Sequence, residues 1–357
     1  MPWDQNLDAI PRYMRAVLLT GHGDLSKLSV RDDVPVPRPA RGEVLIRVRA
    51  AGVNNTDIAV RTGWYSGSVK RGEDGAQALW TGSSMVFPRI QGADACGHIV
   101  ATGEGVDPAR IGERVLVEPI FRYREDDGTE RFDYFGSECD GAFAEYAVAP
   151  SVHAHRVRSM LSDAELAGVP CAWSAAENML QRAGVSVGDR VLVTAASGGV
   201  GSAALQLARR RGAEVIAVAS YAKAPELAEK GFAQSIPREA DPLKTLGADS
   251  LDVVIDAAGG PSVRSLLQCL VRGGRYAVAG AIAGAEVNLD LRTIYLKDLS
   301  LFGCTVFPSG LFRHLVNYLE RGEVRPWLSE EFALEDIAAA QEAFLRKQHL
   351  GKIVLLT

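Results

Sequence analysis

A glycine-rich turn between a buried strand and a helix constrains the fold of this chain more than any other feature. The segment that begins at Val191 reads VLVTAASGGVGSAALQLA, so Ala196, Gly198 and Gly201 form an A-x-G-x-x-G pattern. The apolar run before the turn predicts a buried strand, and the Ala/Leu-rich run after it predicts a helix. A turn of this kind in this context is typical of a dinucleotide site on a parallel α/β sheet.

The turn offers a place for a pyrophosphate. Gly198 would let the backbone approach the phosphates, and Gly201 would let the helix pack closely against the strand. The helix N-terminus adds unpaired N–H groups and the positive end of its dipole. An ordinary tight turn is the alternative interpretation, and Ala at the first position is a mild departure from the pattern. The predicted cofactor-binding residues here are Ala196, Ser197, Gly198, Gly199, Val200 and Gly201.

The end of the next strand indicates which dinucleotide is bound. NAD-selective folds usually place Asp or Glu here to accept the ribose 2′-hydroxyl. This chain has Ser220, followed by Lys223, so a hydroxyl and a cation stand where a carboxylate would repel a 2′-phosphate. The sequence therefore favours NADP(H) over NAD, with Arg238 as a further phosphate partner. The alternative is that Lys223 is only a solvated lysine at the start of a helix.

The rest of the chain divides into two parts that differ in their pattern of apolar residues. Short apolar segments separated by Gly and Pro continue to about Pro150, and charged and apolar residues alternate from Val44 to Arg49. This texture predicts a β-rich or barrel-like first domain. Apolar strands without polar alternation then alternate with helices, which predicts a doubly wound parallel sheet covered on both faces. Those strands begin at Arg190, Glu214, Leu251 and Gly274, and a closing strand follows Gly351.

Composition excludes several classes of function. The net charge is −5 and no long block of like charge occurs, so neither a nucleic acid nor a membrane surface is an expected partner. No apolar run approaches the roughly 18 residues of a spanning helix, and the N-terminus does not resemble a signal peptide. Five widely spaced cysteines fit reduced thiols better than a disulfide framework. A cytoplasmic protein is the expectation.

Five motifs together resemble the medium-chain dehydrogenase/reductase superfamily, and in particular its zinc-free quinone oxidoreductase branch. The resemblance covers 14–357. It implies a GroES-like β-rich catalytic domain (14–165 and 306–357), a Rossmann domain (166–305), an active-site cleft between them, and a homodimer or homotetramer. The motifs are Gly52-Val-Asn-Asn-Thr-Asp, Gly92-Ala-Asp-Ala-Cys-Gly, Asp140-Gly-Ala-Phe-Ala-Glu-Tyr, the glycine turn and Gly351-Lys-Ile-Val-Leu.

The same resemblance argues against zinc. Zinc alcohol dehydrogenases of this superfamily have Cys where Asn54 stands and His-Glu where Ala93 and Asp94 stand, so only Cys171 keeps a ligand type. The lobe that holds four cysteines in those enzymes is matched by 121–140, which has one cysteine. His153 and His155 are two apart on a predicted strand and are expected to face solvent. No metal site is predicted.

Without a metal, the expected substrates are hydride acceptors that delocalise the resulting negative charge themselves. A quinone or an α,β-unsaturated carbonyl does so, and the protein then supplies positioning, hydrogen-bond donors and one proton. The resemblance indicates Tyr65 as the proton donor. The alternative is that Tyr65 is only an aromatic side chain of the rim or core, with no role in proton transfer. Asn54 is expected to hydrogen-bond the substrate carbonyl or the nicotinamide side, or only to cap a turn. Thr56 occupies the proton-relay position of the zinc enzymes.

The resemblance also adds residues on the cofactor side. Gly280 and Phe302 are expected near the ribose and nicotinamide, and Lys352 is expected to reach the cofactor from the last strand. The segment 63–88 is expected to be either a lid over the pocket or a surface loop. The predicted protein is thus a zinc-independent, NADP(H)-dependent oxidoreductase for a small electrophilic substrate. An alcohol dehydrogenase-type enzyme and a nucleotide-binding member without turnover are the alternatives.

Overall fold

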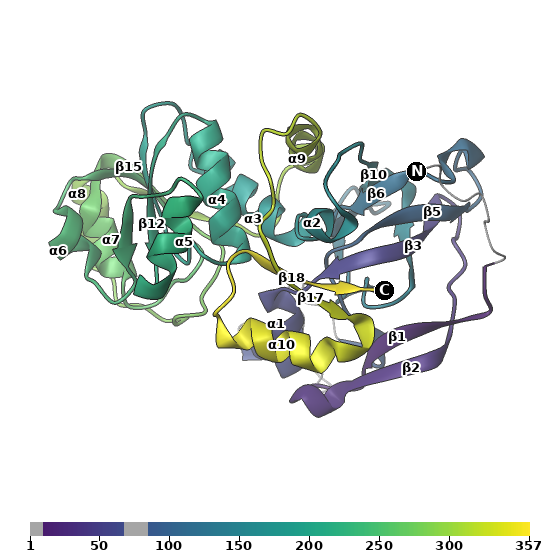
Figure 1. Cartoon of the computed structure of the whole chain (residues 1–357). Helices are drawn as coiled ribbons and strands as arrows, with labels where there is room; N and C mark the ends of the chain where they lie inside the picture. Colours follow the sequence, from purple (N-terminus) through teal and green to yellow (C-terminus); the bar gives the residue numbers. More distant parts are fainter. Residues whose placement is uncertain (1–9, 68–84) are drawn as a thin grey trace. The chain divides into compact units, whose positions relative to one another are not determined.

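Two compact units make up the part of the chain that the computed structural model describes, residues 10–67 and 85–357 (Figure 1). The first unit contains the described residues up to Cys171, together with Leu328–Gln348 and Lys352–Thr357. The second contains Ala172–Trp327 and His349–Gly351. The domain limits expected from the sequence, 166 and 306, remain a prediction; in the structure the helix at Leu311–Glu320 groups with the second unit.

The first unit is built on a sheet with the strand order β10-β6-β5-β3-β18-β17, in which β9 also pairs with β3. Separate small sheets, β2-β1-β4 and β7-β8, flank it among the described residues. The strands of this unit are β1 (Tyr13–Leu19), β2 (Leu28–Pro35), β3 (Glu43–Gly52), β4 (Arg89–Ile90), β5 (Cys96–Thr102), β6 (Arg114–Val117), β7 (Ile120–Arg124), β8 (Glu130–Tyr134), β9 (Tyr146–Pro150), β10 (Ala154–Arg156), β17 (Leu328–Ala333) and β18 (Lys352–Leu356).

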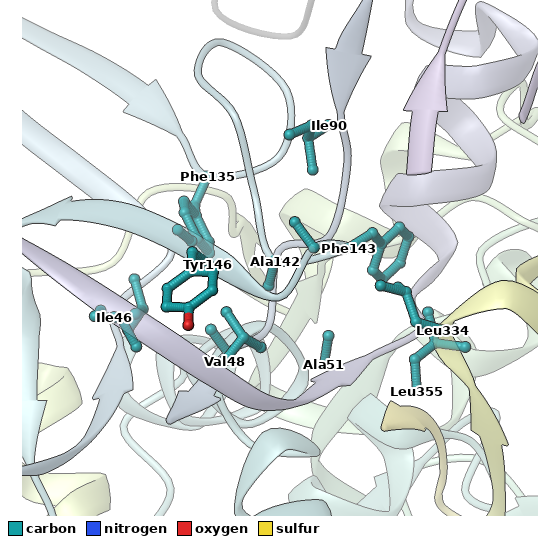
Figure 2. Close-up of a cluster of buried hydrophobic side chains, with 14 of the residues drawn as sticks. Ile46, Val48, Ala51, Ile90, Phe135, Ala142, Phe143, Tyr146, Leu334 and Leu355 are labelled. Atoms are coloured by element: carbon teal, nitrogen blue, oxygen red, sulfur yellow. The ribbon is translucent and has the colours of Figure 1, made fainter. Parts of the chain in front are cut away.

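Strand β3 is the centre of this sheet. The alternation from Val44 to Arg49 predicts a half-buried strand, but in β3 only Arg47 and Arg49 are exposed. Strand β3 pairs along its edges with β5, β9 and β18, and side chains from both of its faces, such as Val44 and Leu45, pack into the core. Figure 2 shows the resulting core, a single cluster that includes Ile46 and Val48 of β3 near Tyr146, and Leu355 of β18 beside Leu334.

Short helices close the first unit. They are α1 (Asn55–Thr62), α2 (Asp163–Ala167) and α10 (Ile337–Arg346). Helix α1 follows β3 directly and ends at Gly63, whose φ of 70° is left-handed and suits glycine. Helix α2 begins with a capping box, because Ser162 accepts from the N–H of Glu165 and Glu165 accepts from the N–H of Ser162.

The second unit is a parallel sheet with the order β13-β12-β11-β14-β15-β16. Its strands run 3-2-1-4-5-6, so the chain reverses direction across the sheet at β11, where such folds bind dinucleotides. The elements are α3 (Pro170–Arg182), β11 (Arg190–Val193), α4 (Gly199–Arg210), β12 (Glu214–Ala219), α5 (Ala224–Glu229), β13 (Ser235–Pro237), α6 (Pro242–Leu246), β14 (Leu251–Asp256), α7 (Val263–Cys269), β15 (Leu270–Val278), α8 (Leu291–Leu296), β16 (Ser300–Gly303) and α9 (Leu311–Glu320).

The structure has the predicted architecture, a β-rich unit and a doubly wound unit with a parallel sheet. The residues of β11 and β14 explain the second sheet, since Val191, Leu192, Val253 and Val254 are fully buried. In the part of the chain that is described, no helix combines the length and the apolar character needed to cross a membrane.

Candidate functional site

The glycine turn lies at the carboxyl end of β11, as predicted. Gly198 is the N-cap of α4, with extended backbone and no side-chain cap, so the first N–H groups of the helix are not capped by a side chain. A Cβ at Gly198 would lie 3.4 Å from the carbonyl oxygen of Ala195, an ordinary contact. A Cβ at Gly201 would overlap that same oxygen. Gly201 therefore allows α4 to pack against β11, while Gly198 leaves the mouth of the turn open.

A buried network behind the turn ties β11 to β14 and β15. Asp256 is fully buried, and its Oδ1 accepts from the Thr194 hydroxyl at 2.6 Å and from the N–H groups of Ala258 and Gly259 at 2.9 Å each. The Tyr276 hydroxyl donates to Oδ2 at 2.5 Å. Burial and this carboxylate raise the pKa of Tyr276 far above its usual value. The network fixes the carboxyl edge of the sheet, and sequence reasoning missed it.

The predicted 2′-phosphate residues come together at the ends of β12 and β13. Ala219 pairs with Pro237, and the N–H of Arg238 donates to the carbonyl of Ala219 at 2.8 Å, so Arg238 follows β13 beside Ser220. Each cation already has a carboxylate partner. Lys223 Nζ lies 2.8 Å from Glu226 Oε1, and Arg238 Nε lies 2.7 Å from Glu239 Oε1.

Gly280 and Phe302 lie farther along the same sheet. A Cβ at Gly280 would meet the carbonyl oxygen of Ala257 at 2.5 Å, so this glycine permits the close approach of the loops after β14 and β15. Phe302 pairs with Ala277 across β15 and β16. The turn, its glycines and the hydroxyl-and-cation pair at β12 fit a nicotinamide dinucleotide. Which of these residues touch it stays a prediction.

A second group of polar side chains is buried in the first unit, at the junction of β3 and α1. Lys352, at the start of β18, is 3% exposed, and its Nζ donates to Val53 O at 3.0 Å, Asn54 Oδ1 at 2.5 Å and Asp94 Oδ2 at 2.9 Å. All three N–H groups of the ammonium are thus used inside this unit. Contact between Lys352 and a cofactor stays a prediction that these bonds do not support.

Asn54 is held from every side by the protein. Its Oδ1 accepts from Lys352, and its Nδ2 donates to Asp94 Oδ2 at 2.8 Å and to Gly52 O at 3.3 Å. The N–H of Asn54 donates to Asp57 Oδ2 at 2.7 Å. No amide hydrogen of Asn54 remains for a substrate carbonyl in this arrangement, so the contacts give Asn54 a positioning role.

Asp94 links this cluster to two phenols and a thiol. Its Oδ1 accepts from the N–H of Cys171 at 2.6 Å, and the Tyr134 hydroxyl donates to Cys171 Sγ at 3.1 Å. Burial raises the pKa of Cys171 to about 12 and that of Tyr134 well above its usual range. Burial also raises the pKa of Tyr65, although a hydrogen bond with Thr56 opposes the shift. At neutral pH both phenols and the thiol are therefore protonated.

Asp57 completes the charge balance of the cluster. It is 2% exposed, and burial raises its pKa to about 7. The N–H of Asn54 opposes this rise, the neighbouring Asp94 adds to it, and Lys352 opposes it. With Asp57 protonated, the ammonium of Lys352 and the carboxylate of Asp94 balance each other. The cluster then carries no net positive charge with which to stabilise an oxyanion.

Comparison with known proteins identifies the family. Residues 40–159 match the model of the alcohol dehydrogenase GroES-like domain, and residues 199–321 match the model of the zinc-binding dehydrogenase domain. A crystal structure from Sinorhizobium meliloti 1021, described as a "putative alcohol dehydrogenase", is 46% identical, with a TM-score of 0.90 over 98% of this chain and 99% of that one. The chain belongs to the medium-chain dehydrogenase/reductase superfamily.

Two curated members of this superfamily cover nearly the whole chain. The acryloyl-coenzyme A reductase of Metallosphaera sedula is 29% identical over 96% of this chain and 100% of its own length. The quinone oxidoreductase of Rattus norvegicus is 29% identical over 97% of this chain and 98% of its own length. Both align across the GroES-like and the Rossmann units of this dehydrogenase/reductase.

The name of the second family model raises the question of zinc, and the residues of this superfamily member do not fit that ion. A catalytic zinc needs about three deprotonated soft or imidazole ligands. Here Asn54 supplies an amide where a soft or imidazole ligand is needed, and the oxygens of Asn54 and Asp94 already bind the Lys352 ammonium. Among the described residues, no group of three His, Cys, Asp or Glu side chains is placed to hold a metal ion.

The expectation that His153 and His155 face solvent is wrong. His155 Nε2 lies 2.9 Å and His153 Nδ1 3.3 Å from Glu118 Oε2, and the three side chains are at most 12% exposed. Burial alone would raise the pKa of Glu118, but its hydrogen bonds to the two imidazoles lower it to about 2. Strand β10 brings the histidines to β6 because His155 pairs with Leu116, two residues before Glu118.

Part of the predicted lid segment, 68–84, lies outside the described residues. The rest of the predicted site in this dehydrogenase/reductase divides into two sets. Tyr65, Thr56 and Asn54 lie with Asp94, Cys171 and Lys352 in the first unit, and the cofactor-side residues other than Lys352 lie in the second. Sequence reasoning missed Tyr134. Tyr134 lies in the segment 121–140, which was compared with the zinc enzymes only for its cysteines.

Proposed function

We propose that this protein is a zinc-independent, NADPH-dependent reductase that transfers hydride to a quinone or an α,β-unsaturated carbonyl. The observation that carries the proposal is the buried cluster around Lys352, in which the one cation contributed by the described residues is an ammonium already paired with Asp94. A site without a free Lewis acid suits acceptors that delocalise the negative charge themselves. The acryloyl-coenzyme A reductase and quinone oxidoreductase relatives reduce acceptors of these two classes by name, which supports the same conclusion.

The proton donor in this proposal is Tyr65. Its raised pKa keeps the phenol protonated at neutral pH, so it can donate to an enolate or hydroquinone anion as that anion forms. Thr56 holds the phenol by a hydrogen bond and provides a second hydroxyl beside it. Asn54 and Lys352 do not touch the substrate in this scheme. They fix the junction between β3 and α1. Thr56 lies in α1 and Tyr65 follows that helix, so the junction positions both side chains.

The nicotinamide cofactor supplies the hydride when it is bound. Gly198 and the uncapped N-terminus of α4 would hold its pyrophosphate, and Ser220 with Lys223 and Arg238 would receive the 2′-phosphate. The side chain of Arg238 is 65% exposed, so it can leave Glu239 for a phosphate at little cost.

The experiment that tests the function is coenzyme oxidation by chelator-treated protein. The acceptor panel contains 1,4-benzoquinone, 9,10-phenanthrenequinone and a series of enones, with NADPH and NADH compared at equal concentration. Turnover that survives chelation and prefers NADPH supports the proposal. Activity that requires zinc, or that appears only with alcohols and NAD, supports an alcohol dehydrogenase. Tight NADPH binding without oxidation by any acceptor supports a nucleotide-binding protein without turnover.

Replacement of the proposed donor gives a direct prediction. Tyr65→Phe is expected to lower kcat by about 10²- to 10⁴-fold with little change in the NADPH dissociation constant, because a general acid acts only on the chemical step. Tyr123→Phe, in strand β7, is the matched control and should keep full activity. Steady-state kinetics with the best acceptor of the panel measure both. An unchanged kcat for Tyr65→Phe would leave Tyr65 as a wall of the pocket.

The coenzyme preference gives a second prediction. Ser220→Asp places a carboxylate at the end of β12, where it would repel a 2′-phosphate and accept a bond from a 2′-hydroxyl. The NADPH dissociation constant is expected to rise by about 100-fold while that of NADH rises little or falls. Ser329→Asp adds the same charge to an exposed position of the first unit and serves as the control. Equal effects on both coenzymes would contradict the NADP assignment.

A further inference from the structure

The buried ammonium of Lys352 lies in a cage of oxygen atoms. Val53 O, Asn54 Oδ1 and Asp94 Oδ2 lie 3.0, 2.5 and 2.9 Å from Nζ. A primary ammonium has three N–H groups and no acceptor, so three acceptors satisfy it completely. Each N–H donor thus has one oxygen acceptor, as a site that binds an ammonium ion requires.

The oxygens of the cage are fixed by contacts that do not involve Lys352. Asp94 Oδ2 also accepts from Asn54 Nδ2, and Asp94 Oδ1 accepts from the N–H of Cys171. Gly52 leaves room for this carboxylate, because a Cβ there would overlap Asp94 Oδ2. The oxygens are therefore held in place without the lysine, whose side chain extends into the cage from β18.

We propose that Lys352 is a tethered cation that takes the place of a metal ion in this member of the superfamily. Asn54, Asp94 and Cys171 stand at positions where the zinc enzymes of the family have ligands or their neighbours. Here the amide and carboxylate oxygens face an ammonium instead. Because the cage is already filled and neutralised, a divalent ion would have to displace a buried charge that is linked covalently to the chain. This inference deepens the zinc-independence in the proposed function, and its tests use no turnover.

Removal of the tether should leave a site for a small ammonium ion. Lys352→Ala deletes the aliphatic stem and the charge, so three preorganised oxygens and an unpaired carboxylate remain around a cavity. Ethylammonium replaces the end of the lysine side chain and carries the same three N–H donors. Lys352→Met deletes the charge but fills most of the space, so it leaves no room for such a guest. These two variants separate the cation cage from the loss of charge alone.

The experiment has two parts. Wild-type protein from zinc-supplemented cultures is analysed for bound metals and is expected to hold far less than one zinc per chain. Thermal melts of wild type, Lys352→Ala and Lys352→Met are then recorded against ethylammonium chloride, with tetramethylammonium chloride as the control because it has no N–H donor. A saturable rise in Tm is expected only for Lys352→Ala and only with ethylammonium.

Stoichiometric zinc in the wild-type protein would overturn the proposal. So would a folded Lys352→Ala variant that responds equally to the two ammonium ions. If Lys352→Ala does not fold, the comparison of Lys352→Met with Asp94→Asn/Lys352→Met decides: removal of the unpaired carboxylate must recover part of the lost Tm, and additive losses would contradict the cage. A reductase assay that fails leaves these results unchanged, so the cage and the proposed function can fail separately.

Discussion

Asp94→Ala is expected to lower the free energy of unfolding of the first unit by about 3–5 kcal/mol, because it leaves a buried ammonium without its counter-ion. Lys352 is 3% exposed and Asp94 is fully buried, so water cannot replace the lost carboxylate. The variant also removes the acceptor for the N–H of Cys171 and for Asn54 Nδ2. Each of these losses leaves a buried donor unpaired, which adds to the cost.

The measurement must report on the first unit alone, since a chain with two units need not unfold in one step. Hydrogen exchange of the β3 and β18 amides does so. The control is Glu104→Ala, which breaks an ion pair with Arg41 in the same unit; the side chains of Arg41 and Glu104 are 82% and 78% exposed. That change is expected to cost about 0–1 kcal/mol. A loss of similar size for Asp94→Ala would mean that the buried pair is as dispensable as the exposed one.

Gly201→Ala is expected to disrupt the glycine turn and with it cofactor binding. The new Cβ would overlap the carbonyl oxygen of Ala195, which is backbone and cannot rotate away. Overpacking of this kind costs about 1–3 kcal/mol, and the displaced turn should weaken NADPH binding by about 100-fold or more.

Two further glycines sharpen this test. Gly303→Ala, with no atom within 4 Å of the added Cβ, should change neither stability nor the fold of the sheet. Gly198→Ala makes only an ordinary contact within the protein, so it should weaken NADPH binding without loss of stability. Isothermal titration and denaturant unfolding of the three variants separate the two effects. If Gly201→Ala binds NADPH as tightly as the wild type, the turn does not hold the pyrophosphate.

The elements that could be predicted from sequence are those determined by local patterns. The turn at Gly198 and Gly201 carries its own strand and helix signals, and the structure places it where the pattern predicts. The unalternating apolar runs of β11 and β14 correctly predict a sheet covered on both faces. The alternation in β3 was misleading, because its two exposed arginines do not reveal that most of the other side chains of the strand are buried on both faces.

The polar cluster could not be predicted, because its contacts join distant parts of the chain. Lys352 bonds to Asp94 across 258 positions and to Asn54 across 298. Only the fold determines that the last strand lies beside the β3–α1 junction. The same holds for the bond between Thr194 and Asp256, 62 positions apart, and for Glu118 beside His155, 37 apart. Sequence reasoning could name Asn54 and Lys352 as site residues, but it could not predict that they bond to each other and to Asp94.

The position of β18 has a consequence for biosynthesis. Strand β18 pairs with both β3 and β17, and Lys352 reaches Val53 across 299 positions of the chain. While the protein is being made, the core in Figure 2 stays open on the nascent chain until Leu355 leaves the ribosome. Ala172–Trp327, nearly all of the second unit, emerges earlier. Domains generally fold as units during synthesis, so the unit that starts first is completed last, and the edge of β3 that binds β18 stays unpaired until then.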